Sequence, residues 1–237
     1  MDTRLATYNV KCFPWFTVDI DAIVNWITQS ADIVALQEVW CRHAAWITAF
    51  EERGWVFLRP PRETHIAAIF GSGLAVAWNP QKFAVDEFIF YPYLSAVGFD
   101  SWVAKGWFRL DMHTPGGFRF RLINTHMQSD YEICDSLFRH VSEPIRMAQA
   151  LQLVSTEVQA PPSPTLIVGD MNTETCWLPR CTWLVQNTGI TFPNTEQTLD
   201  NCACWRSDRW QVVGHRVASE CRWSDHFPVL WRLRHSI

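Results

Sequence analysis

Short runs of apolar residues alternate with turn-forming residues along the chain. Several runs have the length and the β-branched or aromatic content of strands. They lie at residues 4–10, 32–39, 73–78, 107–113, 118–127, 165–171 and 226–233. Turn signals such as Asn79-Pro80 and Thr114-Pro115-Gly116-Gly117 separate them. The pattern therefore predicts a sheet-rich protein.

Other stretches follow the period of a helix, at residues 18–29, 41–54 and 142–159. In the last of these, Ile145, Ala148 and Leu151 lie along one helical face. Strands and helices alternate at first and strands cluster later, which favours an α/β fold with a mixed sheet. Because we find no repeat and no linker long enough to divide the chain, we expect one domain over residues 1–237.

Composition indicates a large core and argues against nucleic acid as a partner. Apolar residues make up 48% of the 237 residues, and there are 14 Trp, so some rings must reach the surface. The formal charge is −4, and only three of the 20 cationic residues are Lys. No overall basic field therefore attracts a nucleic acid. A bound metal ion could still supply the positive charge that a phosphate needs.

The N-terminal segment lacks the basic and apolar parts of a signal peptide, and no apolar run is long enough to span a bilayer. We therefore expect a soluble, cytoplasmic protein, or one that is peripheral at membranes, and we expect it to be a monomer. In that compartment the eight Cys would be free thiols.

Polar residues stand where several predicted strands end. In PTLIVGDMNTE, the apolar residues 166–168 run into Asp170 and Asn172. The same arrangement recurs at Asn9, Glu38 and His126. Because strand ends in α/β sheets gather side chains into a crevice, these residues could form one site. Carboxylate and amide oxygens suit Mg²⁺. Taken singly, such a residue is more typical of a cap or a turn.

Ser224-Asp225-His226 is a second group with chemical potential. A carboxylate beside a histidine can orient the ring and stabilise its protonated form, as general acid–base catalysis requires. Neighbouring residues on a strand point to opposite faces, however, so Asp225 can assist His226 only if the chain bends there. The alternative is a capped turn.

Taken in order, six segments resemble the endonuclease/exonuclease/phosphatase superfamily, which includes DNase I, apurinic endonucleases, inositol phosphatases and neutral sphingomyelinases. They are TYNV, LQEVW, INTHMQ, GDMN, TLDN and SDHFPV. The match extends from Asn9 to His226. The resemblance implies a DNase I-like four-layer α/β sandwich, with two mixed sheets face to face, helices outside and the active site at one edge.

The resemblance also implies the metal site and the position of the attacking water. It makes Glu38 the main metal ligand, with Asn9 beside it, for Mg²⁺ or alternatively Mn²⁺. Asp170 and Asn172 would hold the attacking water and a phosphate oxygen.

The remaining roles concern proton transfer and substrate contact. By resemblance, His226 would be the general base, oriented by Asp225, and His126 would donate to an oxygen of the transition state. Lys105 and Asp200 would contact the substrate. The two residues after Asp200 depart from the family pattern, so a turn role for Asp200 stays open.

Within the superfamily, three features are most similar to the neutral sphingomyelinase branch. They are Lys105-Gly106 before a strand, NTHMQSDY at 124–131 and RMAQALQ at 146–152. This resemblance implies Mg²⁺-dependent hydrolysis of sphingomyelin, a phospholipid at a membrane surface, to ceramide and phosphocholine. The alternatives are a Mg²⁺-dependent nuclease, a DNA-repair or inositol-type phosphoesterase, and a binding module without turnover.

Two features bear on the choice of substrate. The aromatic segment 86–107 either forms strands packed on the core or forms a rim, with Phe99 and Trp102, that dips into a lipid interface. Pairs of arginines either form a local groove for nucleic acid or lie on the solvent face of strands. These pairs are Arg119/Arg121, Arg206/Arg209 and Arg232/Arg234.

Overall fold

The computed structural model describes residues 2–61, 71–130, 139–205 and 209–235. Its strands are β1 (Asp2–Cys12), β2 (Ile33–Val39), β3 (Val56–Leu58), β4 (Ala75–Trp78), β5 (Ala84–Pro92), β6 (Gly106–His113), β7 (Arg119–His126), β8 (Thr165–Asp170), β9 (Cys181–Trp183), β10 (Asp200–Trp205), β11 (Trp210–Val217) and β12 (Val229–His235). Its helices are α1 (Ile20–Ser30), α2 (His43–Glu51), α3 (Arg139–Val158) and the 3₁₀-helix η2 (Gly98–Trp102).

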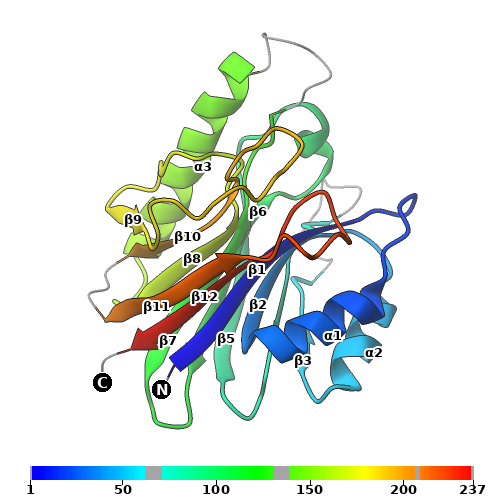
Figure 1. Ribbon diagram of the computed structural model, residues 1–237. Coiled ribbons are helices and arrows are strands. Elements are labelled where there is room, and N and C mark those ends of the chain that lie inside the picture. The colour runs from blue at the N-terminus through cyan, green and yellow to red at the C-terminus, as the bar shows by residue number, and fades with distance from the viewer. Residues whose placement is uncertain (1, 62–70, 131–138, 206–208, 236–237) are drawn as a thin grey trace.

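The strands form two six-stranded mixed sheets with the orders β11-β12-β1-β2-β4-β3 and β5-β6-β7-β8-β10-β9. Each sheet contains one parallel pair, β1 with β2 and β7 with β8, and all other neighbours are antiparallel. The two parallel pairs pack against each other across the sandwich. Their carboxyl ends lie at the same edge, where the long loops gather in the upper part of Figure 1.

Three hydrophobic clusters separate four layers. The central cluster lies between the sheets and joins Leu5 and Ile33 of one sheet to Phe108, Leu122 and Leu166 of the other. A second cluster packs α1 and α2 on the outer face of the first sheet, and a third packs α3 on the outer face of the second. The predicted four-layer α/β sandwich is therefore confirmed.

The first helix shows how the sequence directs this layering. Asp19 caps α1, because its side chain accepts a hydrogen bond from the backbone N–H of Ala22 at 3.0 Å. Buried apolar residues then follow at helical spacing, at Ile20, Ile23, Val24 and Ile27. The single apolar face holds α1 against the sheet.

The face of α3 that packs on the second sheet is not the face that the spacing of its apolar residues predicts. Ala148 and Leu151 of the predicted face are exposed and Ile145 is only partly buried, whereas Ala150, Leu153 and Val154 pack on the sheet. The same inner face carries polar residues at Ser142, Arg146, Gln149 and Glu157. These side chains are buried through hydrogen bonds and ion pairs, so hydrophobicity alone points to the wrong face.

No disulfide joins one described cysteine to another, and Cys134 lies outside the described residues. None of the helices in the described ranges is both long and apolar enough to cross a membrane.

Candidate active site

The polar residues predicted at strand ends do lie together. Asn9 of β1 donates through Nδ2 to Glu38 Oε1 of β2 at 3.0 Å and to Asp170 Oδ2 of β8 at 2.9 Å. The bond to Asp170 joins the two parallel pairs across the sandwich. His126, the last residue of β7, pairs in register with Asp170. The topology thus brings residues far apart in sequence to one edge of the sandwich.

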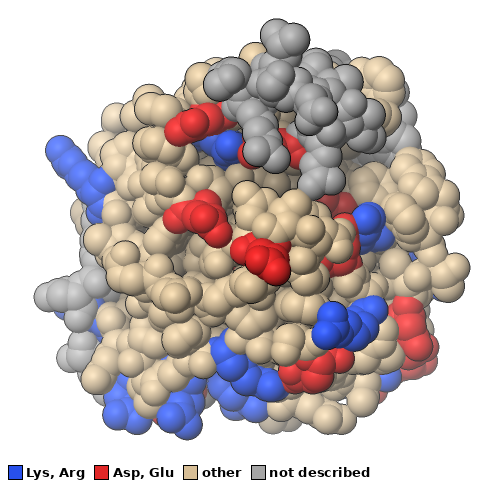
Figure 2. Space-filling view, turned by 45° about the horizontal axis from the view of Figure 1, so that its top comes forward, with Lys and Arg blue, Asp and Glu red and all other residues tan. Residues whose placement is uncertain are grey.

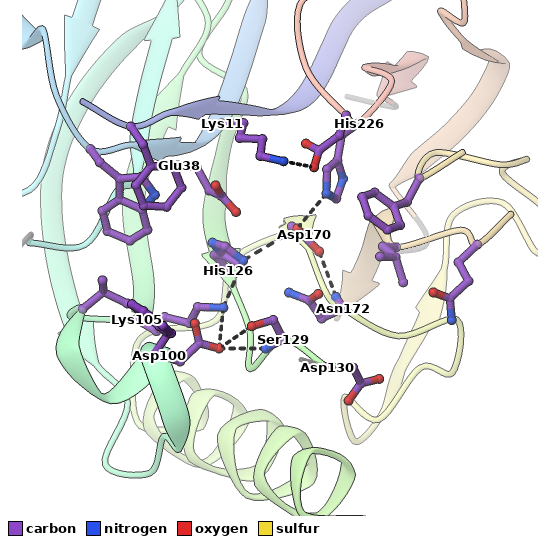
Figure 3. A pocket seen from close by; sticks show the side chains of 18 of the residues that line it. Lys11, Glu38, Asp100, Lys105, His126, Ser129, Asp130, Asp170, Asn172 and His226 are labelled. Atoms are coloured by element: carbon purple, nitrogen blue, oxygen red, sulfur yellow. Dashed lines mark hydrogen bonds and ion pairs between the residues drawn. The ribbon is translucent and has the colours of Figure 1, made fainter. Parts of the chain in front are cut away.

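Asp170 occupies the centre of this group and is 1% exposed. Figure 3 shows His126, His226 and Asn172 around it. Its Oδ2 lies 3.6 Å from His126 Nε2 and 3.8 Å from His226 Nε2. Its Oδ1 accepts a hydrogen bond from the backbone N–H of Asn172 at 2.9 Å. The side chain of Asn172 in turn donates to the Met127 carbonyl at 3.1 Å.

Unusual backbone conformations place these side chains. Glu38 and Asn172 have φ values of 59° and 51°, in the left-handed region that non-glycine residues seldom adopt. Gly169, just before Asp170, has a φ of 145°, and a Cβ there would lie 2.0 Å from the Thr125 carbonyl oxygen. Only glycine allows this close approach of β8 to β7. Such strain clusters at functional sites.

The carboxylate that holds His226 is Asp200, and the expectation that Asp225 does so is wrong. His226 Nδ1 lies 2.7 Å from Asp200 Oδ2. Asp225 points elsewhere and pairs with Lys11 Nζ at 2.6 Å. Asp200 begins β10 opposite Asp170, and it is fully buried. Asp200 therefore contacts the side of His226 that faces away from the cavity, and it does not contact a substrate as predicted.

The two histidines titrate in opposite directions. Burial alone would lower the pKa of His226, but the carboxylates of Asp200 and Asp170 outweigh it and raise that pKa to about 10. Burial, with help from the Lys105 ammonium, lowers the pKa of His126 to about 3. At neutral pH this arrangement therefore has a charged His226 and a neutral His126.

Lys105 lies under His126 and is only 3% exposed. Its Nζ donates to the Met127 carbonyl at 2.6 Å, lies 2.8 Å from Asp100 Oδ2 and lies 3.0 Å from His126 Nε2. Asp100 also accepts from the backbone and hydroxyl of Ser129 at 2.8 Å each. Since Lys105 has these partners, it supports His126 and is largely withheld from an incoming molecule.

The segment RMAQALQ positions the loop after β7. Arg146 donates to the Gln128 carbonyl at 3.1 Å and to Asp130 Oδ1 at 2.9 Å. Gln149 Oε1 accepts from the backbone N–H of Gln128 at 2.9 Å. Asp130 and Ser129 then line the cavity above the site. Tyr131, the last residue of NTHMQSDY, lies outside the described residues.

These residues open into a cavity of about 590 Å³. Aromatic side chains from two separate segments form its rim, and three of them are largely exposed: Trp15 (65%), Phe99 (64%) and Trp102 (53%). Their rings contact others, Phe13 with Trp15 at 5.1 Å and Phe99 with Trp102 at 5.0 Å between centroids. The first part of the segment 86–107 therefore belongs to the edge strand β5, and η2 in the same segment forms part of this rim.

Arginine is absent from the described residues that line the cavity. In Figure 2, most blue side chains lie toward the lower edge of the view, and acidic ones are scattered across its middle. Several arginines of the predicted pairs have acidic partners outside the cavity, namely Arg119 with Asp86, Arg121 with Asp111 and Glu157, and Arg232 and Arg234 with Asp2. Arg206 lies outside the described residues.

The donor set fits a hard divalent cation. Glu38 is partly buried, which raises its pKa, and its one hydrogen bond within the described part of the chain comes from the neutral amide of Asn9. Two carboxylates, Glu38 and Asp170, thus share one amide, and a cation would balance their charge. Carboxylate and amide oxygens are also the ligands that Mg²⁺ prefers.

A second group of potential ligands fits a cation less well. Atoms of Asp170, Asp200 and His226 lie within 4.8 Å of one another. However, His226 Nδ1 and Asp200 Oδ2 already share a short hydrogen bond, and a cation between them would have to displace its proton. Glu38 with Asp170 and Asn9 is therefore the better metal site.

Comparison with solved structures finds the same fold. Sphingomyelinase C from Streptomyces griseocarneus has 16% identity and a TM-score of 0.74, over 98% of this chain and 99% of the other. A mutant of beta toxin from Staphylococcus aureus with bound magnesium ions has 16% identity and a TM-score of 0.73, over 100% of both chains. D. rerio TDP2, complexed with a single-strand DNA product, has 10% identity and a TM-score of 0.74, over 98% and 99%.

Sequence comparison is more specific about the family. No curated protein matches the sequence significantly. A family model described as Endonuclease/Exonuclease/phosphatase family matches residues 6–226, which include every strand-end residue of the site. The chain therefore belongs to the endonuclease/exonuclease/phosphatase family.

Proposed function

We propose that the protein is a Mg²⁺-dependent phosphodiesterase that hydrolyses sphingomyelin to ceramide and phosphocholine, acting as a single domain. The aromatic rim of the cavity is the observation that favours a lipid substrate. Trp15, Phe99 and Trp102 expose apolar rings around the opening of the site. Such rings are favoured at a lipid–water interface and disfavoured in water, so the rim suits a substrate held in a membrane.

The chain's own residues would divide the work of the reaction. His226, oriented by Asp200, would take the proton of the attacking water, with Asp170 beside both. Asn172 would donate to the phosphate oxygens on which negative charge accumulates. His126 would join it after a change of tautomer, because its Nε2 accepts from the Lys105 ammonium in the free site. Because these groups are held by strand ends, they would be aligned before the substrate arrives.

Glu38 and Asp170 would hold the cation. Asn9 donates through Nδ2 to both carboxylates, so it would ligate the cation only through Oδ1, which here accepts from the Lys11 backbone N–H. With Mg²⁺ bound there, negative charge on the phosphate oxygens would be neutralised and the pKa of His226 would fall toward the range that a general base needs. Mn²⁺ is the alternative ion, since it prefers similar ligands.

A nuclease is the second candidate, because exposed aromatic rings can also stack on the bases of single-stranded DNA. The absence of arginine from the described lining of the cavity counts against it, since phosphate contacts supply much of the affinity for nucleic acid. A binding module without turnover is disfavoured, because Glu38, Asp170 and the Asp200–His226 pair form a chemically competent group at one edge.

A substrate panel tests the proposal. The pure protein is incubated with sphingomyelin vesicles, single-stranded DNA, abasic duplex DNA and an inositol phosphate, each with Mg²⁺ and with a chelator. We expect release of phosphocholine that the chelator abolishes and Mg²⁺ restores. Cleavage of DNA alone would refute the lipid proposal, and binding without any product would favour the binding module.

A further inference from the structure

Lys11 lies where β1 is distorted next to the site. Asn9 pairs with Gln37 and Cys12 pairs with Val39, so β1 has one more residue than β2 in this interval. Lys11 has a φ of 46°, and its backbone N–H donates to Asn9 Oδ1 at 3.2 Å. This is a bulge, a feature that is frequent next to active sites.

The alternation of β1 fixes the side to which Lys11 points. Tyr8, Val10 and Cys12 pack under α1 and α2. Asn9 faces the opposite sheet, where it contacts Asp170. Lys11 continues the row of Asn9, and its side chain lines the cavity beside His226 (Figure 3).

Among the lysines and arginines of the described cavity lining, Lys11 is the one that an incoming anion can reach. Of the described residues lining the cavity, only Lys11 and Lys105 are lysine or arginine. The side chain of Lys105 is 2% exposed and lies among Asp100, His126 and the Met127 carbonyl. The side chain of Lys11 is 36% exposed.

Asp225 and Phe16 hold the Lys11 ammonium in position. Asp225 Oδ2 lies 2.6 Å from Lys11 Nζ, and the Phe16 ring centroid lies 5.0 Å from it. An exposed ion pair of this kind stabilises a fold little. A lysine held over a cavity in an unfavourable backbone conformation instead indicates a functional use.

We propose that Lys11 is a substrate-contacting residue that binds an anionic oxygen of the phosphoester while it stays paired with Asp225. The proposal rests on the proposed phosphodiesterase function and adds a contact to it. An ammonium with three N–H donors can keep one bond to Asp225 and give another to a phosphate oxygen. It would thus bind from the His226 side of the cavity, opposite Lys105 and His126.

The test measures binding of inorganic phosphate by calorimetry in the presence of Mg²⁺, without any turnover. The variants are Lys11→Gln, Lys11→Arg and, as a matched control, Lys82→Gln, since Lys82 pairs with Asp32 away from the cavity. We expect Lys11→Gln to weaken phosphate binding about tenfold. The affinity of Lys11→Arg for phosphate should be closer to that of wild type, and the affinity of Lys82→Gln should equal that of wild type. Unchanged affinity in Lys11→Gln would overturn the proposal.

A fourth variant distinguishes direct contact of Lys11 with phosphate from a structural role of the Lys11–Asp225 ion pair. Asp225→Asn should bind phosphate as tightly as wild type or more tightly, because it frees Lys11 and removes a nearby negative charge. Equal losses in Asp225→Asn and Lys11→Gln would show that only the ion pair matters and would overturn the proposal. If phosphate binds through Lys11 but no substrate is cleaved, the proposed function fails while this inference stands. If sphingomyelin is cleaved and Lys11→Gln binds phosphate normally, only this inference fails.

Discussion

Asp200 Oδ2 lies 2.7 Å from His226 Nδ1, although the two residues are 26 positions apart. Asp200 begins β10 in one sheet, and His226 lies just before β12 in the other. The pair therefore spans the edge of the sandwich, as the bond from Asn9 to Asp170 does. A carboxylate at Nδ1 fixes the tautomer and leaves Nε2 facing Asp170 and the cavity.

Asp200→Asn should lower kcat by about two to three decades, because an amide neither stabilises the imidazolium nor fixes the tautomer. Asp225→Asn is the matched control and should lower kcat by less than about tenfold, since Asp225 contacts Lys11 instead. Both values are measured with a soluble phosphodiester, after thermal unfolding shows that each variant is folded. A larger loss in Asp225→Asn than in Asp200→Asn would contradict the structural assignment.

Asp170→Ala and His226→Ala should each lower kcat by two decades or more, on the order of 3 kcal/mol at the transition state. Asp170 is the group that both histidines and Asn9 share, and His226 is the proposed base. Steady-state kinetics with Mg²⁺ at saturation provide the measurement. Near-native turnover in either variant would remove that residue from the proposed chemistry.

Polar substitution at the rim should separate membrane binding from chemistry. Trp15→Ser and Trp102→Ser, or Phe99→Ser, should weaken binding to sphingomyelin vesicles in a sedimentation assay while kcat on a soluble phosphodiester stays unchanged. Each buried ring contributes on the order of 2 kcal/mol at an interface. Leu151→Ser is the control, since Leu151 is exposed on α3 outside the cavity lining. Equal losses on both substrates would indicate damage to the fold.

The sequence reveals buried strands better than edge strands. Strands β3, β5, β9 and β11 are the four sheet edges, and β10 adjoins one of them. One interpretation of the aromatic segment 86–107, strands packed on the core, indicates β5, but no apolar run predicts the other four. An edge strand is covered less on its faces, so its sequence mixes polar and apolar residues, as in the exposed positions of β5. The central strands, covered on both faces, give the continuous runs that can be read directly.

The site was partly predictable for a related reason. Asn9, Glu38, His126 and Asp170 lie at or near the ends of buried strands, and such strands of an α/β sheet end at one edge. The partner of His226 was not predictable, because Asp225 is nearer in sequence while sheet register places Asp200 beside it. Lys11 and Asp100 also escaped prediction, since a bulge and a 3₁₀-helix determine their placement and neither has a clear sequence signal.

Gly169→Ala should lower the free energy of unfolding by about 2–4 kcal/mol and reduce activity through Asp170. Its φ of 145° excludes a side chain, and a Cβ would meet the Thr125 carbonyl oxygen at 2.0 Å. Gly117→Ala is the control, because Gly117 has a φ of 81° but open space around it, so it should lose only about 1 kcal/mol. Urea unfolding compares them, and equal losses would show that the close approach is unimportant.

Asp32 should make the stability of the protein depend on pH in the acidic range. The carboxylate is buried and accepts hydrogen bonds from Arg4 and Lys82, with its closest contacts to both at 2.8 Å. Burial alone would raise the pKa of Asp32, but these cations outweigh it and lower the pKa below its ordinary value. The folded state therefore favours the charged form, and the stability that this provides is present above the unfolded pKa of about 4.

Asp32→Asn should accordingly lower the free energy of unfolding at pH 7 by about 1–3 kcal/mol, a range kept modest because Arg4 and Lys82 are partly exposed. As the pH falls below about 4 and through the folded pKa, wild-type Asp32 becomes protonated and the difference should shrink. Urea unfolding from pH 3 to pH 8 measures it. Asp21→Asn, which changes an exposed carboxylate, should show little effect. A difference between wild type and Asp32→Asn that stays constant down to pH 3 would mean that the charge of Asp32 does not stabilise the fold.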